Sequence, residues 1–126
     1  TGHQFERVPA SGALEYLKGD LYVPHAKNRF CIEVKNYEKS PLSDKIFTAP
    51  RTNNLIKWWK KLEQQAEGGN QEPLLFFKYN RSEVFVVTNL LPQNTDHWLR
   101  IEWLDCYVIL AKTWLEEENV EFLNGV

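Results

Sequence analysis

Three residues of this chain have types and spacing that suit metal-assisted chemistry: Asp20, Glu33 and Lys35. In a strand, side chains two positions apart lie on the same face, so Glu33 and Lys35 point the same way. Two carboxylates that face each other repel unless a cation lies between them, and hard oxygen ligands suit Mg²⁺, with Mn²⁺ as a substitute. A nearby lysine can orient a water or balance a developing charge. These are the requirements of phosphodiester hydrolysis.

An antiparallel hairpin would bring these residues together. We predict strands over residues 20–23 and 30–35, with Leu21 opposite Ile32 and Asp20 opposite Glu33. This register collects the apolar side chains on one face and the carboxylates on the other. The spacing alone leaves an alternative open, in which the charged residues are ordinary solvated positions and a Glu–Lys contact stabilises little.

The remaining pattern predicts the elements that hold this hairpin. Leu55, Trp58, Trp59, Leu62 and Ala66 lie on one face of an amphipathic helix, capped by Thr52 or Asn53 and ended by Gly68-Gly69. Nearly continuous apolar runs predict strands at residues 74–79, 84–87 and 107–110, the first two joined by a turn at 80–82. Strands of this kind are covered on both faces. Thr113 and Glu116 have the form of a capping box, so we place the start of a terminal helix there.

The sum is a single α/β domain over residues 1–126, with a central mixed β-sheet flanked by helices.

Residues 1–62 contain eleven Lys and Arg against six Asp and Glu, whereas residues 63–126 contain four against eleven. Such polarity allows a basic face for nucleic acid, although it is also compatible with an accident of surface composition. No apolar run suggests a membrane partner, and Cys31 and Cys106 lie in apolar stretches typical of free thiols. We therefore expect a reducing, cytoplasmic location.

The N-terminal motifs carry a family resemblance. The segment Arg7-Val8-Pro9-Ala10-Ser11-Gly12, followed by Gly19-Asp20 and Ile32-Glu33-Val34-Lys35, resembles the signature of the archaeal-type Holliday junction resolvases. That family belongs to the PD-(D/E)xK nuclease superfamily and implies a restriction-endonuclease-like fold. The match runs from Phe5 to Lys35 and extends loosely to Val87. Gly19 stands where the superfamily pattern has Pro, and the N-terminal helix usual in the family is expected to be absent.

The resemblance also implies roles for individual residues. Asp20, Glu33 and the backbone carbonyl of Val34 would be metal ligands, and Lys35 would position the attacking water. Ser11 would act beside them at the phosphate, as part of the catalytic set. The implied DNA contacts are Arg7, Ser11, Lys18, Lys27, Arg29 and Lys39.

The function implied by the resemblance is Mg²⁺-dependent resolution of four-way DNA junctions by paired cuts, performed by a homodimer. We expect recognition of shape and backbone, because no helix is evident that would read the major groove. The helix with Trp58 and Trp59 and the segment 98–103 are the candidate dimer contacts. Two alternatives remain open: another PD-(D/E)xK endonuclease of restriction or repair type, and a non-cleaving module that binds branched DNA.

Overall fold

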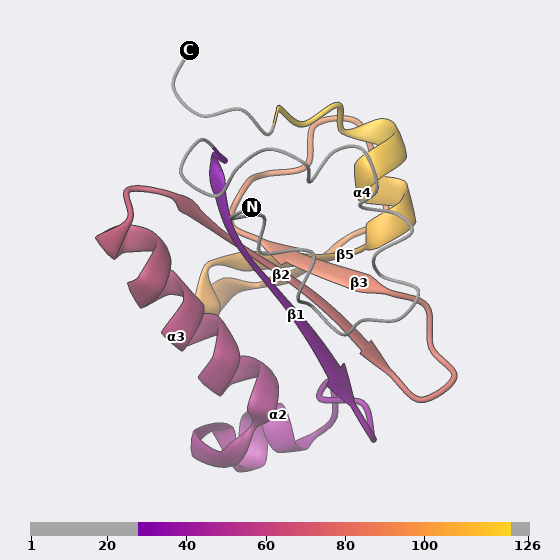
Figure 1. The fold of residues 1–126 in the computed structure, drawn as a ribbon. Helices are drawn as coiled ribbons and strands as arrows, with labels where there is room; N and C mark the ends of the chain where they lie inside the picture. The colour runs from indigo at the N-terminus through magenta and orange to yellow at the C-terminus, as the bar shows by residue number, and fades with distance from the viewer. Residues whose placement is uncertain (1–27, 122–126) are drawn as a thin grey trace.

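The computed structural model describes residues 28–121, in which a five-stranded sheet separates two main helices (Figure 1). The elements in chain order are β1 (Phe30–Tyr37), α2 (Lys45–Thr48), the 3₁₀ turn η3 (Pro50–Thr52), α3 (Asn54–Gly68), β2 (Glu72–Tyr79), β3 (Phe85–Thr88), β4 (Leu99–Ile101), the 3₁₀ turn η4 (Glu102–Leu104), β5 (Cys106–Leu110) and α4 (Ala111–Glu117). Within this range, no helix is long and apolar enough to cross a membrane.

The sheet is mixed, with the strand order β1-β2-β3-β5-β4. β1 and β2 are parallel, and the chain passes between them through α2, η3 and α3, as a parallel pair requires. The other neighbours are antiparallel, beginning with the hairpin in which Phe77 pairs with Phe85. Arg81 lies in the turn of this hairpin with a φ of 67°. The hairpin predicted from residues 74–87 is therefore confirmed.

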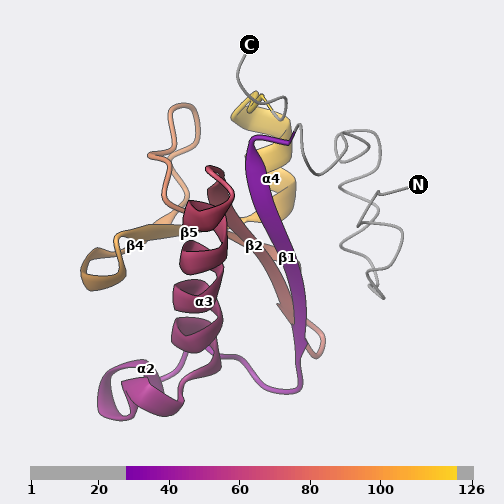
Figure 2. The same cartoon turned by 60° about the vertical axis from the view of Figure 1, so that its left-hand side comes forward.

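The two faces of the sheet are covered by different helices. α3 lies across one face and α4 packs on the other, as Figure 2 shows. In β2, Leu74 and Phe76 join the cluster under α4, whereas Leu75 and Phe77 join the cluster under α3. This explains why β2 is apolar at every position from 73 to 77, since neither face meets water.

α3 follows from a cap and an apolar stripe, as the sequence predicts. The side-chain oxygen of Asn53 accepts a hydrogen bond from the N–H of Ile56 at 3.1 Å, while its amide donates to the carbonyl of Pro41 at 2.8 Å. Asn53 is thus the cap, in preference to Thr52. Trp59 is fully buried at the centre of the stripe, but Trp58 lies at its margin and is half-buried. That position leaves the Trp58 ring free to contact a neighbouring strand.

α4 is anchored by Trp114, which is 1% exposed and meets the rings of Phe30 and Phe76 edge-on, with centroids 6.0 and 6.4 Å away. Each such contact stabilises by about 1 kcal/mol beyond the area it buries. The predicted capping box is wrong: the helix begins at Ala111, the N-cap position is Leu110, and no side chain caps it. Burial of Ala111 and Trp114 sets the start of the helix, so Thr113 falls within its first turn.

The predicted fold class is otherwise confirmed: the chain has the restriction-endonuclease-like α/β architecture, with a central mixed sheet between helices. β1 continues two residues beyond the predicted strand, to Tyr37, and β5 begins at Cys106. Four elements that the sequence did not predict are α2, η3, β4 and η4. The partner strand over residues 20–23, and with it the hairpin register, lies outside the described residues.

Candidate active site

β1 places the two described members of the predicted constellation side by side. The Nζ atom of Lys35 lies 3.7 Å from the Oε2 atom of Glu33, and both side chains are partly exposed, at 24% and 39%. Ile32 and Val34 pack into the cluster under α4 on the opposite face. The predicted alternation of β1 is therefore confirmed, and it turns the carboxylate and the ammonium toward the side of the sheet that α3 covers.

The indole of Trp58 supports the ammonium of Lys35. The Nζ atom of Lys35 lies 3.4 Å from the centroid of the ring, and the Nζ atom of Lys61 lies 4.9 Å from the same centroid. A cation over an aromatic face is attracted by the negative charge density of the ring, most strongly for tryptophan. Lys35 is thus held between a carboxylate and an indole. The sequence did not indicate this role for Trp58, because the contact joins residues 23 positions apart on different elements.

The backbone of β1 determines where the carbonyl of Val34 points. The carbonyl of Arg29 accepts a hydrogen bond from the N–H of Glu72 at 3.0 Å, so odd-numbered residues of this strand direct their backbone groups toward β2. Alternate residues of a strand point their backbone groups to opposite sides. The carbonyl of Val34 therefore points away from β2, within the plane of the sheet.

The donors on β1 fit a divalent metal in type. The carboxylate of Glu33 is partly exposed, and its contact with Lys35 at 3.7 Å is too long for a strong hydrogen bond, so its oxygens retain their capacity to bind a cation. Carboxylate and carbonyl oxygens are the ligands that Mg²⁺ and Mn²⁺ prefer. Residues 28–121 by themselves contain no group of three His, Cys, Asp or Glu that could hold a metal. The described strand thus offers donors of a suitable type, although the described residues do not by themselves form a metal site.

The cysteines do not belong to this set. Burial, together with the negative charge of Glu33, raises the pKa of the Cys31 thiol, and burial raises the pKa of Cys106 to about 12. Both thiols therefore remain protonated near neutral pH, whereas metal binding and nucleophilic attack require the thiolate. The two residues form no disulfide with each other, in agreement with the prediction of free thiols.

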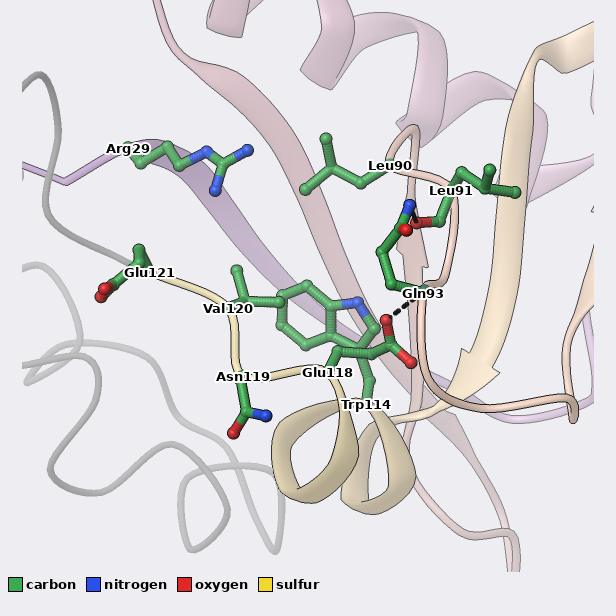
Figure 3. A pocket seen from close by; sticks show the side chains of 9 residues that line it. All are labelled: Arg29, Leu90, Leu91, Gln93, Trp114, Glu118, Asn119, Val120 and Glu121. Atoms are coloured by element: carbon green, nitrogen blue, oxygen red, sulfur yellow. Dashed lines mark hydrogen bonds between the residues drawn. The ribbon is translucent and has the colours of Figure 1, made fainter.

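Two of the predicted DNA contacts lie in the described range, at opposite ends of β1. Arg29 forms an ion pair with Glu72 and lies 5.1 Å from the ring centroid of Phe30. It also lines a cavity of about 310 Å³ beside α4, which Figure 3 shows with Trp114 and Glu118. Lys39 is exposed beyond the other end of the strand, in the loop that follows Tyr37. Lys39 is therefore at the same end of β1 as Lys35, whereas Arg29 is not.

The cavity beside α4 lies next to a loop that the carboxylate of Glu118 holds in place. The carboxylate of Glu118 accepts hydrogen bonds from the backbone N–H groups of Gln93, Asn94 and Thr95, at 2.6, 2.9 and 2.7 Å. Burial alone would raise the pKa of Glu118, but these three hydrogen bonds lower it below its ordinary value. The carboxylate thereby fastens the loop after β3 to the end of α4, and the cavity lies next to this attachment (Figure 3).

Five predicted site residues fall outside the described residues, so their predicted roles remain untested by the geometry. They are Arg7, Ser11, Lys18, Asp20 and Lys27.

Comparison with known proteins bears on the whole chain. Residues 1–123 match a protein family described as "phage putative PDDEXK endonuclease". The chain is also similar to protein D14 of Escherichia phage T5, with 32% identity over 137 aligned positions that cover 98% of this chain and 84% of that protein. No solved structure matches the chain significantly. These matches support the PD-(D/E)xK superfamily, and they do not separate junction resolvases from other endonucleases within it.

Proposed function

The chain belongs to the phage PDDEXK endonuclease family, and we propose that within this family it resolves four-way DNA junctions in a reaction that depends on Mg²⁺. The observation that supports the cleavage chemistry most directly is the Glu33–Lys35 pair, held on one face of β1 and backed by Trp58. The choice of the junction as substrate rests on the resemblance of residues 5–35 to the archaeal-type resolvases.

The residues of the site divide the chemistry between them. Glu33, Asp20 and the carbonyl of Val34 would hold the metal ion, for which Mn²⁺ should substitute. When bound, such an ion supplies Lewis-acid stabilisation of charge and lowers the pKa of water. Lys35 orients the attacking water and balances the negative charge that develops on the phosphate. The indole of Trp58 restrains the ammonium of Lys35 before the reaction begins. Lys35 therefore loses little further conformational freedom when the transition state forms.

Paired cuts across a junction require two active sites, so we propose that the functional unit is a homodimer. The described surface has exposed apolar side chains on and next to β4, where Leu99 is 61% exposed and Trp103 is 51% exposed. These residues are our candidates for the dimer contact. Trp59, by contrast, is fully buried within its own subunit and has no surface to offer a second one.

The test compares a synthetic four-way junction with a linear duplex built from the same arms. Cleavage is measured with Mg²⁺, with Mn²⁺ and with EDTA, for the unchanged chain and for Glu33→Gln, Lys35→Ala and Asp20→Asn. Lys112→Ala, an exposed lysine on α4 across the sheet, is the matched control. We expect paired symmetric nicks in the junction that require the metal, survive Lys112→Ala and disappear in the three site variants.

The other outcomes separate the alternatives. Equal cutting of the junction and the duplex would refute junction specificity and favour an endonuclease of restriction or repair type. Tight binding of the junction with no cutting under any metal condition would favour the non-cleaving module. Light scattering gives the mass of the chain alone at working concentration and the mass of its complex with the junction. A mass of one chain in the first case, and of one chain plus one junction in the second, would refute the homodimer.

A further inference from the structure

The positive charge of the described residues is concentrated in one stretch of the chain. From Lys35 to Lys61 there are seven Lys and Arg, against only Glu38 and Asp44. Residues 62–121 contain four Lys and Arg against eleven acidic residues. Six of the seven basic side chains in the first stretch are exposed: Lys39, Lys45, Arg51, Lys57, Lys60 and Lys61. The stretch comprises the end of β1, α2, η3 and the first half of α3, which lie together at one end of the molecule (Figure 2).

Two of the three lysines of α3 are not compensated by an ion pair within the described part of the chain, whereas the charge of the third, Lys60, acts on Glu63 of the same helix. Lys57 and Lys61 are four residues apart on the helix, and like charges at this spacing destabilise a helix. Neither lysine forms a salt bridge with any carboxylate of residues 28–121. The chain therefore keeps two adjacent charges that weaken its own helix. A polyanion bound along this face would relieve their repulsion.

This row of charges is continuous with the candidate active site. Lys61 and Lys35 approach the same Trp58 ring, so the indole joins the exposed side of α3 to the Glu33–Lys35 pair on β1. At the start of α3 the surface is hollowed, with a volume of about 630 Å³ between this helix and the end of β1. Lys39 and Lys45 line the hollow together with Glu38 and Asp44, so exposed lysines continue past the N-terminus of the helix although the lining of the hollow has no net formal charge.

We propose that this surface binds the sugar–phosphate backbone of DNA on the side of the cleaved phosphate that α3 covers. We call it the α3 basic face and define it by Lys39, Lys45, Arg51, Lys57 and Lys61. The inference rests on the proposed nuclease function and adds where the substrate lies. A duplex backbone fits because it is a continuous line of negative charge, and lysine contacts to phosphate hold DNA without reading its sequence.

The test measures binding without cleavage, in EDTA, of a fluorescent four-way junction over a series of salt concentrations. A plot of log affinity against log salt has a negative slope, and each lost phosphate contact makes this slope shallower by about 0.9. Lys57→Gln and Lys61→Gln are the test variants, and Lys112→Gln, also an exposed lysine on a helix, is the control. We expect each test variant to bind several-fold more weakly, with a salt slope that is shallower by about 0.9. The control should bind as the unchanged chain does.

Two results would overturn the inference, and they are distinguishable. If the unchanged chain binds and cuts the junction while Lys57→Gln and Lys61→Gln keep its affinity and salt slope, the α3 basic face is refuted and the nuclease function stands. If the unchanged chain neither binds nor cuts DNA, both proposals fail together. Glutamine keeps the helix and all these side chains are exposed, so equal melting temperatures exclude unfolding as the cause of weaker binding.

Discussion

Replacing Trp58 with leucine removes the ring that supports the ammonium of Lys35. A cation–π contact stabilises by about 0.5–1 kcal/mol at an exposed site and by about 2 kcal/mol when the cation is desolvated. The Lys35 side chain is 24% exposed and its Nζ atom lies 3.4 Å from the ring centroid, so we place this contact near 1–1.5 kcal/mol. If this restraint acts in the transition state, its loss slows cleavage about 5- to 10-fold, since about 1.4 kcal/mol corresponds to tenfold in rate.

The assay is single-turnover cleavage of a four-way junction at saturating enzyme and Mg²⁺, which isolates the chemical step. Trp58→Phe retains an aromatic face with a weaker attraction for cations, so its rate should fall between those of the unchanged chain and Trp58→Leu. Tyr107→Leu is the matched control, because it removes another cation–π contact, that of Arg100 at 4.7 Å, on a strand away from β1. Its cleavage rate should equal that of the unchanged chain.

A particular pattern would refute this reasoning. Equal rates for Trp58→Phe and Trp58→Leu would mean that the volume of the side chain matters and its aromatic face does not. A loss confined to junction affinity in EDTA, with the rate at saturation unchanged, would assign Trp58 to binding and not to the positioning of Lys35. Thermal melts of each variant show whether a slower rate reflects a smaller folded fraction.

Three further outcomes are expected. The backbone hydrogen bonds of Glu118 lower its pKa, so its carboxylate stabilises the fold above its ordinary pKa. This contribution to the free energy of unfolding is lost as the pH falls through the lowered pKa. Glu118→Gln should therefore flatten that part of the acid-unfolding curve measured by circular dichroism. Asn53→Ala removes the cap of α3 and the bond to Pro41, and should lower the free energy of unfolding in urea by about 2 kcal/mol. Phe47 is 76% exposed, so Phe47→Ser should leave stability within about 0.5 kcal/mol. The same change should weaken junction binding several-fold if the ring stacks on an open base step, as a titration by fluorescence anisotropy would show.

Local patterns in the sequence predict much of this fold because they report burial directly. The stripe of α3 and its Asn53 cap, and the apolar runs of β2 and β3, each lie within a short window of sequence. The start of α4 is missed because a polar capping pattern at Thr113 competes with tertiary burial of Ala111. β4 is missed because it has three residues, of which Leu99 and Arg100 are exposed, so its pattern carries no apolar alternation.

The candidate site likewise has features that a short stretch of sequence predicts and contacts that it does not. The shared face of Glu33 and Lys35 follows from the two-residue period of a strand, which is a local property. The contact between Lys35 and Trp58 depends on how α3 lies across the sheet, and no pattern within either segment records that distance. The same is true of Arg29, whose pairing with Glu72 joins residues 43 positions apart.

That ion pair also bears on the alignment of the two parallel strands. Because β2 is apolar on both faces, sliding it by one residue would still bury Leu75 and Phe76, so hydrophobicity only weakly penalises a slipped register. For β1 the same slip would rotate Glu33 and Lys35 under α4, where Trp114 fills the space. Arg29 and Glu72 lie where both strands begin, about 20 Å along the strand from Lys35. This surface ion pair thus forms in the same register that keeps Glu33 and Lys35 on the side of the sheet that α3 covers.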